Sequence, residues 1–424
     1  MRQPLGPADV FAALLDGIIR RSGGAGNIGQ LRLRLDREID GEALARAWRR
    51  LGEEAWPLGG RVLHGLRGMR LCFAGPVPLS TERCTDLDAT ADVHLDEGTG
   101  HVLARLAVAE RGVALTWHHA LCDARAASGL LAALPALAAG KRLGERWWEA
   151  GYRGIPGLPP TARERGQQAQ QAMPLLKPHR LVPLWRPLER AGKPVSPANR
   201  ARPFARHTTV IGGDELTAFQ GRQRQATGRM AETPFLLACV AAALEACLGV
   251  GGDVLMPLTV DLREAGDRRL LANCHGYCFL RVPAGLASKD LTLAAQHLKQ
   301  AHRDWLAADG LVKLSSSMSW FSYLPERLTT AQLGNHQPGV WASCVVANAG
   351  ASPITGEWFG AQPLALDHAA LIPANPGVGV LFHRDARGLV FDTLACGRVV
   401  SVLSPARLAA ALRQQLLERP LTTS

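Results

Sequence analysis

The chain lacks the features of several large protein classes. It contains no uninterrupted apolar stretch of about 20 residues, the length that a membrane-spanning helix needs. The most apolar run, residues 235–250, is shorter and contains Glu245, so we interpret it as a buried helix. The N-terminal residues lack the apolar segment of a signal peptide. Internal repeats and low-complexity tracts are also absent. These absences disfavour a membrane-spanning, secreted or repeat protein.

The cysteines show no pattern of disulfides or of a metal site. There are nine, an odd number, and none forms a C-x-x-C pair. Several lie inside apolar runs, which is typical of buried free thiols in a reducing compartment. We therefore expect a cytoplasmic protein.

Acidic residues are the minority among the charged ones. The chain has 37 Asp and Glu against 48 Lys and Arg, a formal net charge of +11. An anionic partner would fit this charge: a phosphorylated cofactor, an acidic carrier protein, a nucleic acid or an acidic membrane surface. The arginines are scattered, without a basic tail or a basic helix interleaved with aromatic residues. We therefore expect no nucleic-acid partner.

Length and patterning predict two α/β domains. At 424 residues the chain exceeds one ordinary domain. Strand and helix patterns alternate in both halves, and the 47% hydrophobic content is enough for a core in each. Prolines recur through residues 143–206, which predicts a long crossover containing one short helix near 162–173. We place the domain boundary near residue 190, giving halves of 1–190 and 191–424.

Hydrophobic periodicity predicts the individual elements. We expect residues 31–35 to form a half-exposed strand, because leucines alternate with arginines there. Thr233 is expected to cap a buried helix that begins with Pro234. A buried strand over 340–347 should stop at Asn348. Asp40 is expected to cap a helix through 44–51, and Asp214 to start another. The other expected helices are 11–20, 124–139, 290–308 and 405–418, and the other expected strands are 61–64, 69–73, 102–108, 113–117, 207–211, 254–260, 378–382 and 389–394.

The strongest candidate for chemistry is a predicted strand-to-helix corner. The strand 113–117 leads directly into His118 and His119, and Asp123 stands where it can cap the following helix. A metal site is disfavoured, because adjacent side chains on an extended backbone point to opposite sides. A core histidine beside a helix cap is as compatible with the spacing as a catalytic site. In a catalytic site, one imidazole would act as a general base and the other would hold the corner.

Three ordered segments resemble one enzyme superfamily. Trp117-His118-His119-Ala-Leu-Cys-Asp123-Ala124 is similar to the HHxxxDG motif of acyltransferases such as chloramphenicol acetyltransferase, nonribosomal peptide synthetase condensation domains and alcohol acetyltransferases. Pro257-Leu-Thr-Val-Asp261-Leu-Arg263, followed by Asn273-Cys-His-Gly276, resembles the family's DLR segment and its downstream Asn-x-x-Gly. Val345-Val-Ala-Asn348-Ala-Gly350 resembles its late Ser-Asn-x-Gly strand end.

This resemblance implies a fold and a site. The fold would be a V-shaped pseudodimer of two chloramphenicol acetyltransferase-like subdomains with a tunnel between them. His119 would be the general base, His118 would be structural, and Asp123 would form an ion pair with Arg263. No cofactor would be bound permanently and no metal would be needed. The co-substrate would be acyl-CoA or the phosphopantetheinyl thioester of an acyl or peptidyl carrier protein, and the acceptor a small-molecule hydroxyl or amine.

Some residues depart from the family pattern or have no clear role. Ala124 stands where the motif has glycine, and the DFGWG motif of the plant branch is absent. Trp117, Asn348 and Ser343 are candidates for lining the tunnel. The oxyanion donor is unassigned; candidates by hydroxyl chemistry are Ser315, Ser316, Ser317, Ser319 and Ser343.

Two functions remain after this comparison. The first is a free-standing acyltransferase of secondary metabolite or lipid biosynthesis. The alternative is a catalytically inactive, condensation-like module that binds carrier proteins, which the Ala124 departure keeps open.

Overall fold

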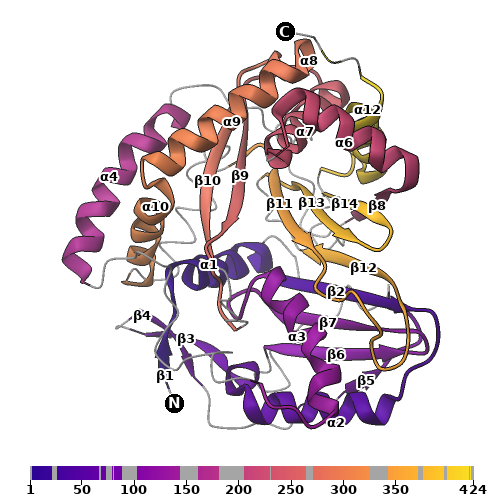
Figure 1. The fold of residues 1–424 in the computed structure, drawn as a ribbon. Helices are drawn as coiled ribbons and strands as arrows, with labels where there is room; N and C mark the ends of the chain where they lie inside the picture. The colour runs from indigo at the N-terminus through magenta and orange to yellow at the C-terminus, as the bar shows by residue number, and fades with distance from the viewer. Residues whose placement is uncertain are drawn as a thin grey trace.

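A computed structural model of the chain gives its fold (Figure 1). The residues that it describes are 2–21, 26–65, 68–72, 79, 81–87, 103–143, 161–180, 205–229, 231–263, 271–323, 342–370, 376–395, 399–419 and 421. The boundary expected near residue 190, most of the proline-rich stretch and Cys396 lie outside these ranges.

The N-terminal half is built on a mixed sheet covered by helices. Its strands in sheet order are β12 (Pro363–Ala370), β2 (Ile28–Leu35), β7 (Gly112–His118), β6 (Ala104–Ala109) and β5 (Thr81–Arg83). Helix α2 (Gly41–Glu54) buries Leu44, Trp48 and Leu51 on one face and is capped by Asp40, whose carboxylate accepts two backbone N–H groups. Helix α3 (Ala124–Ala138) packs beside it and buries its leucines in the same core.

The C-terminal half has its own sheet and core. Its strands in sheet order are β10 (His275–Val282), β9 (Val254–Asp261), β11 (Val345–Ala351), β13 (Val378–Asp385), β14 (Gly388–Ala395) and β8 (Ala205–Ile211). The core also receives α6 (Gly213–Thr227), α7 (Glu232–Leu248), α9 (Leu291–Ala307), α10 (Gly310–Ser319) and α12 (Pro405–Leu417). Buried Glu245 of α7 accepts the N–H groups of Gly285 and Ser288 at α8 (Leu286–Lys289), which explains a charge inside the apolar run.

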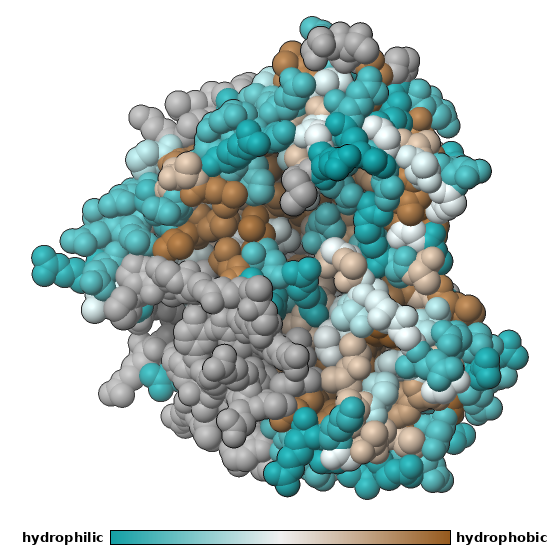
Figure 2. All heavy atoms as spheres, viewed as in Figure 1, coloured by the Kyte–Doolittle hydropathy of each residue, from teal (hydrophilic) through white to brown (hydrophobic). Residues whose placement is uncertain are grey.

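Smaller elements complete the fold. Strands β1 (Arg2–Pro4), β4 (Gly68–Cys72) and β3 (Arg61–Gly65) form a small antiparallel sheet beside η1 (Trp56–Gly59). Helix α1 (Pro7–Arg21) lies between the two halves, and α4 (Ala162–Arg180) runs beside α10, which continues into η4 (Trp320–Tyr323) (Figure 1). In the same view, apolar residues gather around α10 and β10, while the outer faces are largely hydrophilic (Figure 2).

The two halves share strands and core residues. Strand β12 follows the C-terminal strand β11 in sequence, yet it pairs with β2 of the N-terminal sheet from Pro363↔Leu35 to Ala370↔Gly29. Just before it, Trp358 is 1% exposed and donates its indole N–H to the carbonyl of Leu131 in α3, at 2.8 Å. The C-terminal half thus completes the sheet and the core of the N-terminal half.

The structure corrects several local expectations. Strand β2 is buried rather than half-exposed: it lies inside the sheet between β12 and β7, and its leucines belong to the N-terminal core. Arg32 is only 3% exposed, and its Nε donates to Gln30 at 2.7 Å. Strand β11 extends past Asn348 to Ala351. Helix α7 begins at Glu232, so Thr233 lies in its first turn and is not the cap. Helix α4 continues beyond residue 173 to Arg180.

The described helices and cysteines bear on membrane insertion and on thiol state. None of the described helices is long and apolar enough to cross a membrane alone; α6 and α7 together reach the required length and hydropathy, across a bend of 99°. The cysteines in the described ranges are all free thiols, and most are buried.

Candidate active site

The corner after β7 brings the predicted histidines to the junction of the two halves. The strand ends at His118, which is paired with Ile28 of β2. Trp117 is 1% exposed, and its indole N–H donates to the carbonyl of Cys122 at 2.9 Å, which closes the turn. Gly29 is required beside it, because a Cβ there would lie 2.3 Å from the indole ring. Trp117 therefore supports the corner from the core side.

Both ring nitrogens of His118 are engaged in holding the corner. Nδ1 accepts the backbone N–H of Ala120 at 3.1 Å, so it carries no proton. Nε2 lies 3.1 Å from Oδ1 of Asp16 in α1, and its N–H points at that carboxylate. With one nitrogen accepting and the other donating, the ring of His118 has no lone pair left to take a proton from a substrate.

His119 is held by its backbone and leaves its ring free. Its N–H donates to the carbonyl of Asn27 at 2.9 Å, and its carbonyl accepts the side-chain N–H of Asn273 at 2.7 Å. Among the described residues, neither ring nitrogen forms a hydrogen bond, and the side chain keeps part of its surface exposed. The ring packs at a tilt against Trp117, with centroids 5.8 Å apart.

The surroundings of His119 keep its ring unprotonated. Protein atoms enclose the imidazole on most sides although some surface remains accessible. Burial, and to a smaller extent the neighbouring His275, lower the pKa of His119 from 6.5 to about 4, while Asp123 opposes this shift. A neutral imidazole at neutral pH can accept a proton without first having to lose one.

Asp123 joins the two halves and caps α3. Its Oδ1 accepts the N–H of Ala126 at 2.9 Å, the usual contact of an N-cap residue. Its Oδ2 accepts the N–H of Cys274 at 3.0 Å, and Nη2 of Arg263 lies 2.9 Å from the same oxygen. Burial alone would raise the pKa of Asp123, but His275 and the positive charge of Arg263 hold it well below its usual range.

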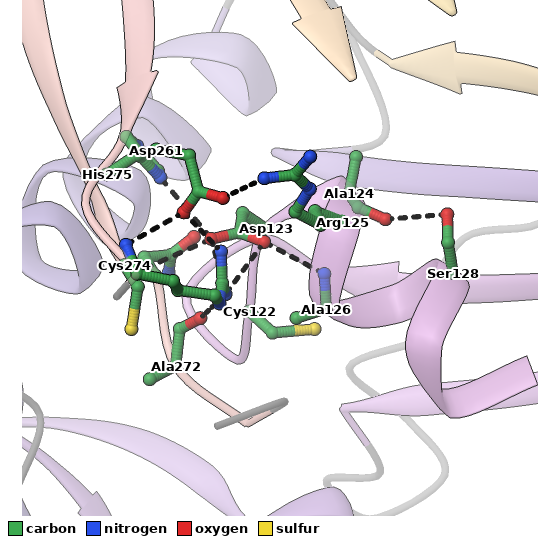
Figure 3. A network of polar contacts seen from close by, with 12 residues as sticks. Cys122, Asp123, Ala124, Arg125, Ala126, Ser128, Asp261, Ala272, Cys274 and His275 are labelled. Atoms are coloured by element: carbon green, nitrogen blue, oxygen red, sulfur yellow. Dashed lines mark hydrogen bonds and ion pairs between the residues drawn. The ribbon is translucent and has the colours of Figure 1, made fainter. Parts of the chain in front are cut away.

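An alternating row of charges continues from this pair. Nη1 of Arg263 lies 3.0 Å from Asp261, which in turn forms an ion pair with Arg125 of α3 (Figure 3). Burial would lower the pKa of Arg263, yet the adjacent Asp123 raises it above the ordinary value, so the buried pair is ionised. The row Arg125–Asp261–Arg263–Asp123 therefore ties the first turn of α3 to the end of β9.

Ala124 fits its position without strain. It is the first residue of α3, its φ is not positive, and its carbonyl accepts the hydroxyl of Ser128 at 2.9 Å. The glycine of the family motif is therefore not needed here for backbone conformation, and the methyl group leaves the neighbouring contacts of Asp123 and Arg125 in place.

Asn348 and Ser343 lie in different places. The side chain of Asn348 accepts the N–H of Gly350 at 3.0 Å, and Gly350 has φ +74°; a Cβ there would lie 3.2 Å from Nη2 of Arg125. The end of β11 therefore lies at the corner. Ser343 is fully buried, and its hydroxyl accepts the N–H of Leu255 at 3.1 Å, so it joins β9 to the segment before β11.

The α10 serines bond within their own helix or to α4. Ser315 donates to the Leu311 carbonyl at 2.7 Å, Ser316 to Gln168 of α4 at 3.0 Å and Ser319 to the Ser316 carbonyl at 2.7 Å. Ser317 is half-buried on the same helix. Within the described ranges, no group of three or more His, Cys, Asp or Glu side chains is arranged to hold a metal ion.

Two site residues were missed by sequence reasoning. His275 is 8% exposed, with Nδ1 at 3.7 Å from Oδ2 of Asp123 and Nε2 at 3.0 Å from the Tyr277 hydroxyl. Asp9 of α1 accepts the side-chain N–H of Asn273 at 2.8 Å. The Asn-x-x-Gly pattern pointed to the segment 273–276, but nothing in it singled out the intervening histidine.

Comparison with known proteins assigns the fold. No protein-family model matches the chain. No curated protein matches it by sequence. Among solved structures, the condensation domain of the Monacolin K polyketide synthase MokA matches with TM-score 0.65 and 12% identity, over 98% of this chain and 96% of that one.

Two further structures match equally well. Polyketide synthase associated protein 5 from Mycobacterium tuberculosis gives TM-score 0.65 and 14% identity, over 95% of each chain. A variant of the starter condensation domain of rhizomide synthetase RzmA, in complex with C8-CoA, gives TM-score 0.65 and 18% identity, over 98% of this chain and 95% of that one.

The fold is therefore a two-subdomain α/β fold of the chloramphenicol acetyltransferase type. More particularly, it is the fold of condensation domains, and the likeness extends over nearly the whole chain.

Proposed function

We propose that this protein is an acyltransferase that moves an acyl group from a coenzyme A or carrier-protein thioester to a hydroxyl or amine of a small-molecule acceptor. The observation that carries the proposal is the contrast between the two histidines. Both nitrogens of His118 are used by the protein, whereas those of the adjacent His119 are free, in a ring with exposed surface. A free, neutral imidazole beside the buried and ionised Asp123–Arg263 pair is suited to general-base chemistry.

The proposed reaction needs only the transfer of one proton through His119. The imidazole takes the proton of the acceptor O–H or N–H, and the resulting nucleophile attacks the thioester carbonyl carbon. The tetrahedral oxyanion then collapses, the C–S bond breaks, and the imidazolium returns its proton to the thiolate. General-base assistance of this kind contributes about 10²–10⁴-fold in rate, and the positioning of both substrates contributes much of the remainder.

The donor assignment rests on a structural relative and on charge. The starter condensation domain of rhizomide synthetase, whose fold is similar, was obtained in complex with C8-CoA. Coenzyme A and carrier proteins are both anionic, and the net charge of +11 favours either. The biosynthesis of secondary metabolites or lipids is the proposed setting, because the structural relatives include condensation domains of a polyketide synthase and of an antibiotic synthetase.

The test measures thiol release and the acylated product. Acyl-CoA thioesters of different lengths and acyl groups loaded on carrier proteins are offered with hydroxyl and amine acceptors. We expect acceptor-dependent release of free thiol, with a matching acyl product by mass spectrometry. His119→Ala should reduce the rate by 10²-fold or more, a loss of about the size expected for a general base. His297→Ala, on the exposed face of α9, is the matched control and should retain the rate.

Two results would overturn the proposal. One is turnover by His119→Ala at the wild-type rate. The other is the absence of transfer from every donor while carrier proteins still bind tightly, which would indicate an inactive carrier-binding module.

A further inference from the structure

Both backbone hydrogen-bonding groups of His119 are bound by buried asparagines, one from each half of the molecule. The His119 N–H donates to the carbonyl of Asn27, just before β2, at 2.9 Å. The His119 carbonyl accepts the side-chain N–H of Asn273, just before β10, at 2.7 Å. Asn27 is 6% exposed and Asn273 is 5% exposed, so water does not compete for these two bonds. The main chain at the proposed base is therefore held from both sides.

Asn273 is in turn anchored on helix α1 through Asp9, which is 1% exposed. Oδ1 of Asp9 accepts the side-chain N–H of Asn273 at 2.8 Å and its backbone N–H at 3.3 Å. The amide of Asn273 thus gives one hydrogen to Asp9 and the other to the His119 carbonyl, which fixes the plane of the amide. Oδ2 of Asp9 accepts the N–H of Gly6 at 2.9 Å, so the same carboxylate closes the first turn of α1.

Asn27 and His118 are anchored on the same helix through Asp16. Oδ1 of Asp16 accepts the backbone N–H of Asn27 at 2.7 Å and lies 3.1 Å from Nε2 of His118. The side-chain N–H of Asn27 donates to the carbonyl of Ala12, about one turn earlier in α1, at 2.9 Å. Asn27 is therefore bound to α1 through both its main chain and its side chain.

The anchoring residues share one face of α1. Asp9, Ala12 and Asp16 stand at the i, i+3 and i+7 positions of a single helical face. The helix lies between the two halves (Figure 1), and its Phe11 packs against the hydrophobic cores of both. One rigid element thus carries the anchors for both backbone bonds of His119.

We propose that α1 is the positioning element of this site: Asp9 and Asp16, acting through the two asparagines, set the direction of the His119 ring. Among the described residues, the ring has no hydrogen bond of its own, so its backbone and its contact with Trp117 determine where it lies. A general base must lie within hydrogen-bond reach of the proton that it takes, and a displacement of about 1 Å can cost about 10²-fold in rate. The two carboxylates therefore act on the placement of the base and not on its chemistry.

The experiment compares removal of each carboxylate with its replacement by asparagine. Asp16→Ala removes the acceptor shared by Asn27 and His118, whereas Asp16→Asn can keep an oxygen in the place of Oδ1. Likewise, Asp9→Ala frees the amide of Asn273, and Asp9→Asn can keep an oxygen directed toward it. Each alanine variant should lower kcat about 10- to 100-fold with little change in KM, and each asparagine variant should recover most of this loss.

A matched variant and a double-mutant cycle separate positioning from stability. Asp290 caps α9 by accepting the N–H of Leu293 at 2.9 Å, so Asp290→Ala should lower the Tm while kcat stays at the wild-type value. In a His119→Ala background, Asp9→Ala and Asp16→Ala should leave the residual rate unchanged, because the group that they position is absent. A purely structural role would lower the residual rate by the same factor as in the wild-type background.

Because this role rests on the proposed function of His119, a second measurement follows the ring without turnover. Histidines of the full-length protein are labelled with ¹³C, and the His119 ring signals are assigned with His119→Gln. The ring current of Trp117, whose centroid lies 5.8 Å away, makes these signals sensitive to the position of the ring. Asp9→Ala and Asp16→Ala should move them, while Asp290→Ala should leave them at the wild-type position.

Each outcome bears on one of the two proposals. Unmoved His119 signals in the folded alanine variants would overturn the role of α1, and so would an equal loss of residual rate in the His119→Ala background. Asn273→Ala breaks the same link but leaves the contact of Asp9 with Gly6, and it replaces Asp9→Ala if that variant does not fold. Absence of turnover from every donor would overturn the acyltransferase proposal, and the NMR signals would still decide whether α1 places the ring.

Discussion

Replacing Asp123 by asparagine tests the clamp between the two halves, which is the ion pair of Asp123 with Arg263. The carboxylate accepts hydrogen bonds at both oxygens, from Ala126 and Arg263 at Oδ1 and from Cys274 and Arg263 at Oδ2. Asparagine has the same shape but only one acceptor oxygen. Its NH₂ group would face either the Ala126 or the Cys274 N–H, so one buried donor would lose its acceptor.

The magnitude follows from the partners that remain. Removing one member of a buried ion pair costs about 3–5 kcal/mol of unfolding free energy. Arg263 still has Asp261 as a partner at 3.0 Å, so the cost of removing the ion pair should lie at the lower end of this range. The unsatisfied N–H adds about 1 kcal/mol. For a chain of 424 residues, an unfolding entropy of about 2.1 cal/mol/K per residue converts about 4 kcal/mol into a Tm lower by roughly 4 °C. Acyl transfer should fall as well, because the corner that carries His119 loses its anchor.

A matched variant separates the ion pair from helix capping. Asp40 caps α2 through its carboxylate but is exposed, and asparagine is an equally good N-cap. Asp40→Asn should therefore change the unfolding free energy by less than about 0.5 kcal/mol. A double-mutant cycle of Asp123→Asn with Arg263→Gln should give a coupling energy of about 1–3 kcal/mol by denaturant unfolding. If Asp123→Asn melts like Asp40→Asn, or if the coupling is zero, the clamp does not hold the halves together.

Three further outcomes are expected. The pKa of His119 is about 4 in the folded protein and near 6.5 in the unfolded chain, so the unfolded state binds more protons between these values and stability falls as the pH drops through this window. By denaturant unfolding, wild type should lose up to about 3 kcal/mol more unfolding free energy than His119→Gln, and equal losses would contradict the low pKa. Gly29→Ala would place a Cβ 2.3 Å from the Trp117 indole, so we expect a Tm lower by several degrees and reduced acyl transfer. Gly41 has open space around it, so Gly41→Ala should melt like wild type; an unchanged Tm in Gly29→Ala would refute the packing argument. Burial raises the pKa of Asp392 to about 6, and one of its oxygens has no hydrogen bond, so stability is lost as the pH rises through this value and the buried carboxyl ionises. The difference in unfolding free energy between Asp392→Asn and wild type should therefore be about 1–2 kcal/mol more favourable at pH 8 than at pH 5, and an unchanged difference would indicate that Arg206 compensates the charge.

Local signals in the sequence were sufficient for most elements. The alternation of Val113, Leu115 and Trp117 with Ala114 and Thr116 predicts β7, because successive side chains of a strand point to opposite faces of the sheet. Asp123 and Asp40 mark the starts of α3 and α2, since capping depends on the first helical turn alone. Such patterns act over a few residues, which is why they can be read without the fold.

The missed features depend on contacts between distant segments. The leucine–arginine alternation of β2 is typical of a half-exposed strand, yet Arg32 is buried, in a sheet whose edge strand β12 comes from residues 363–370. The Asp123–Arg263 contact was expected from the resemblance to a superfamily and not from spacing. His275 could not be singled out, because a histidine after a buried loop has many uses; its place between Tyr277 and Asp123 exists only after β10 and α3 have come together.

The pairing of β12 with β2 also has a consequence for the order in which the chain acquires its structure during synthesis. The last strand of the N-terminal sheet is not made until residues 363–370 leave the ribosome, so β2 waits with an unpaired edge while most of the protein is translated. Closing so long a loop is slow compared with local folding, because its entropy must be lost before the strand contacts form. The histidine corner follows β7 at the end where His118 pairs with Ile28 of β2, so it belongs to a sheet that is complete only after residue 370 has been made.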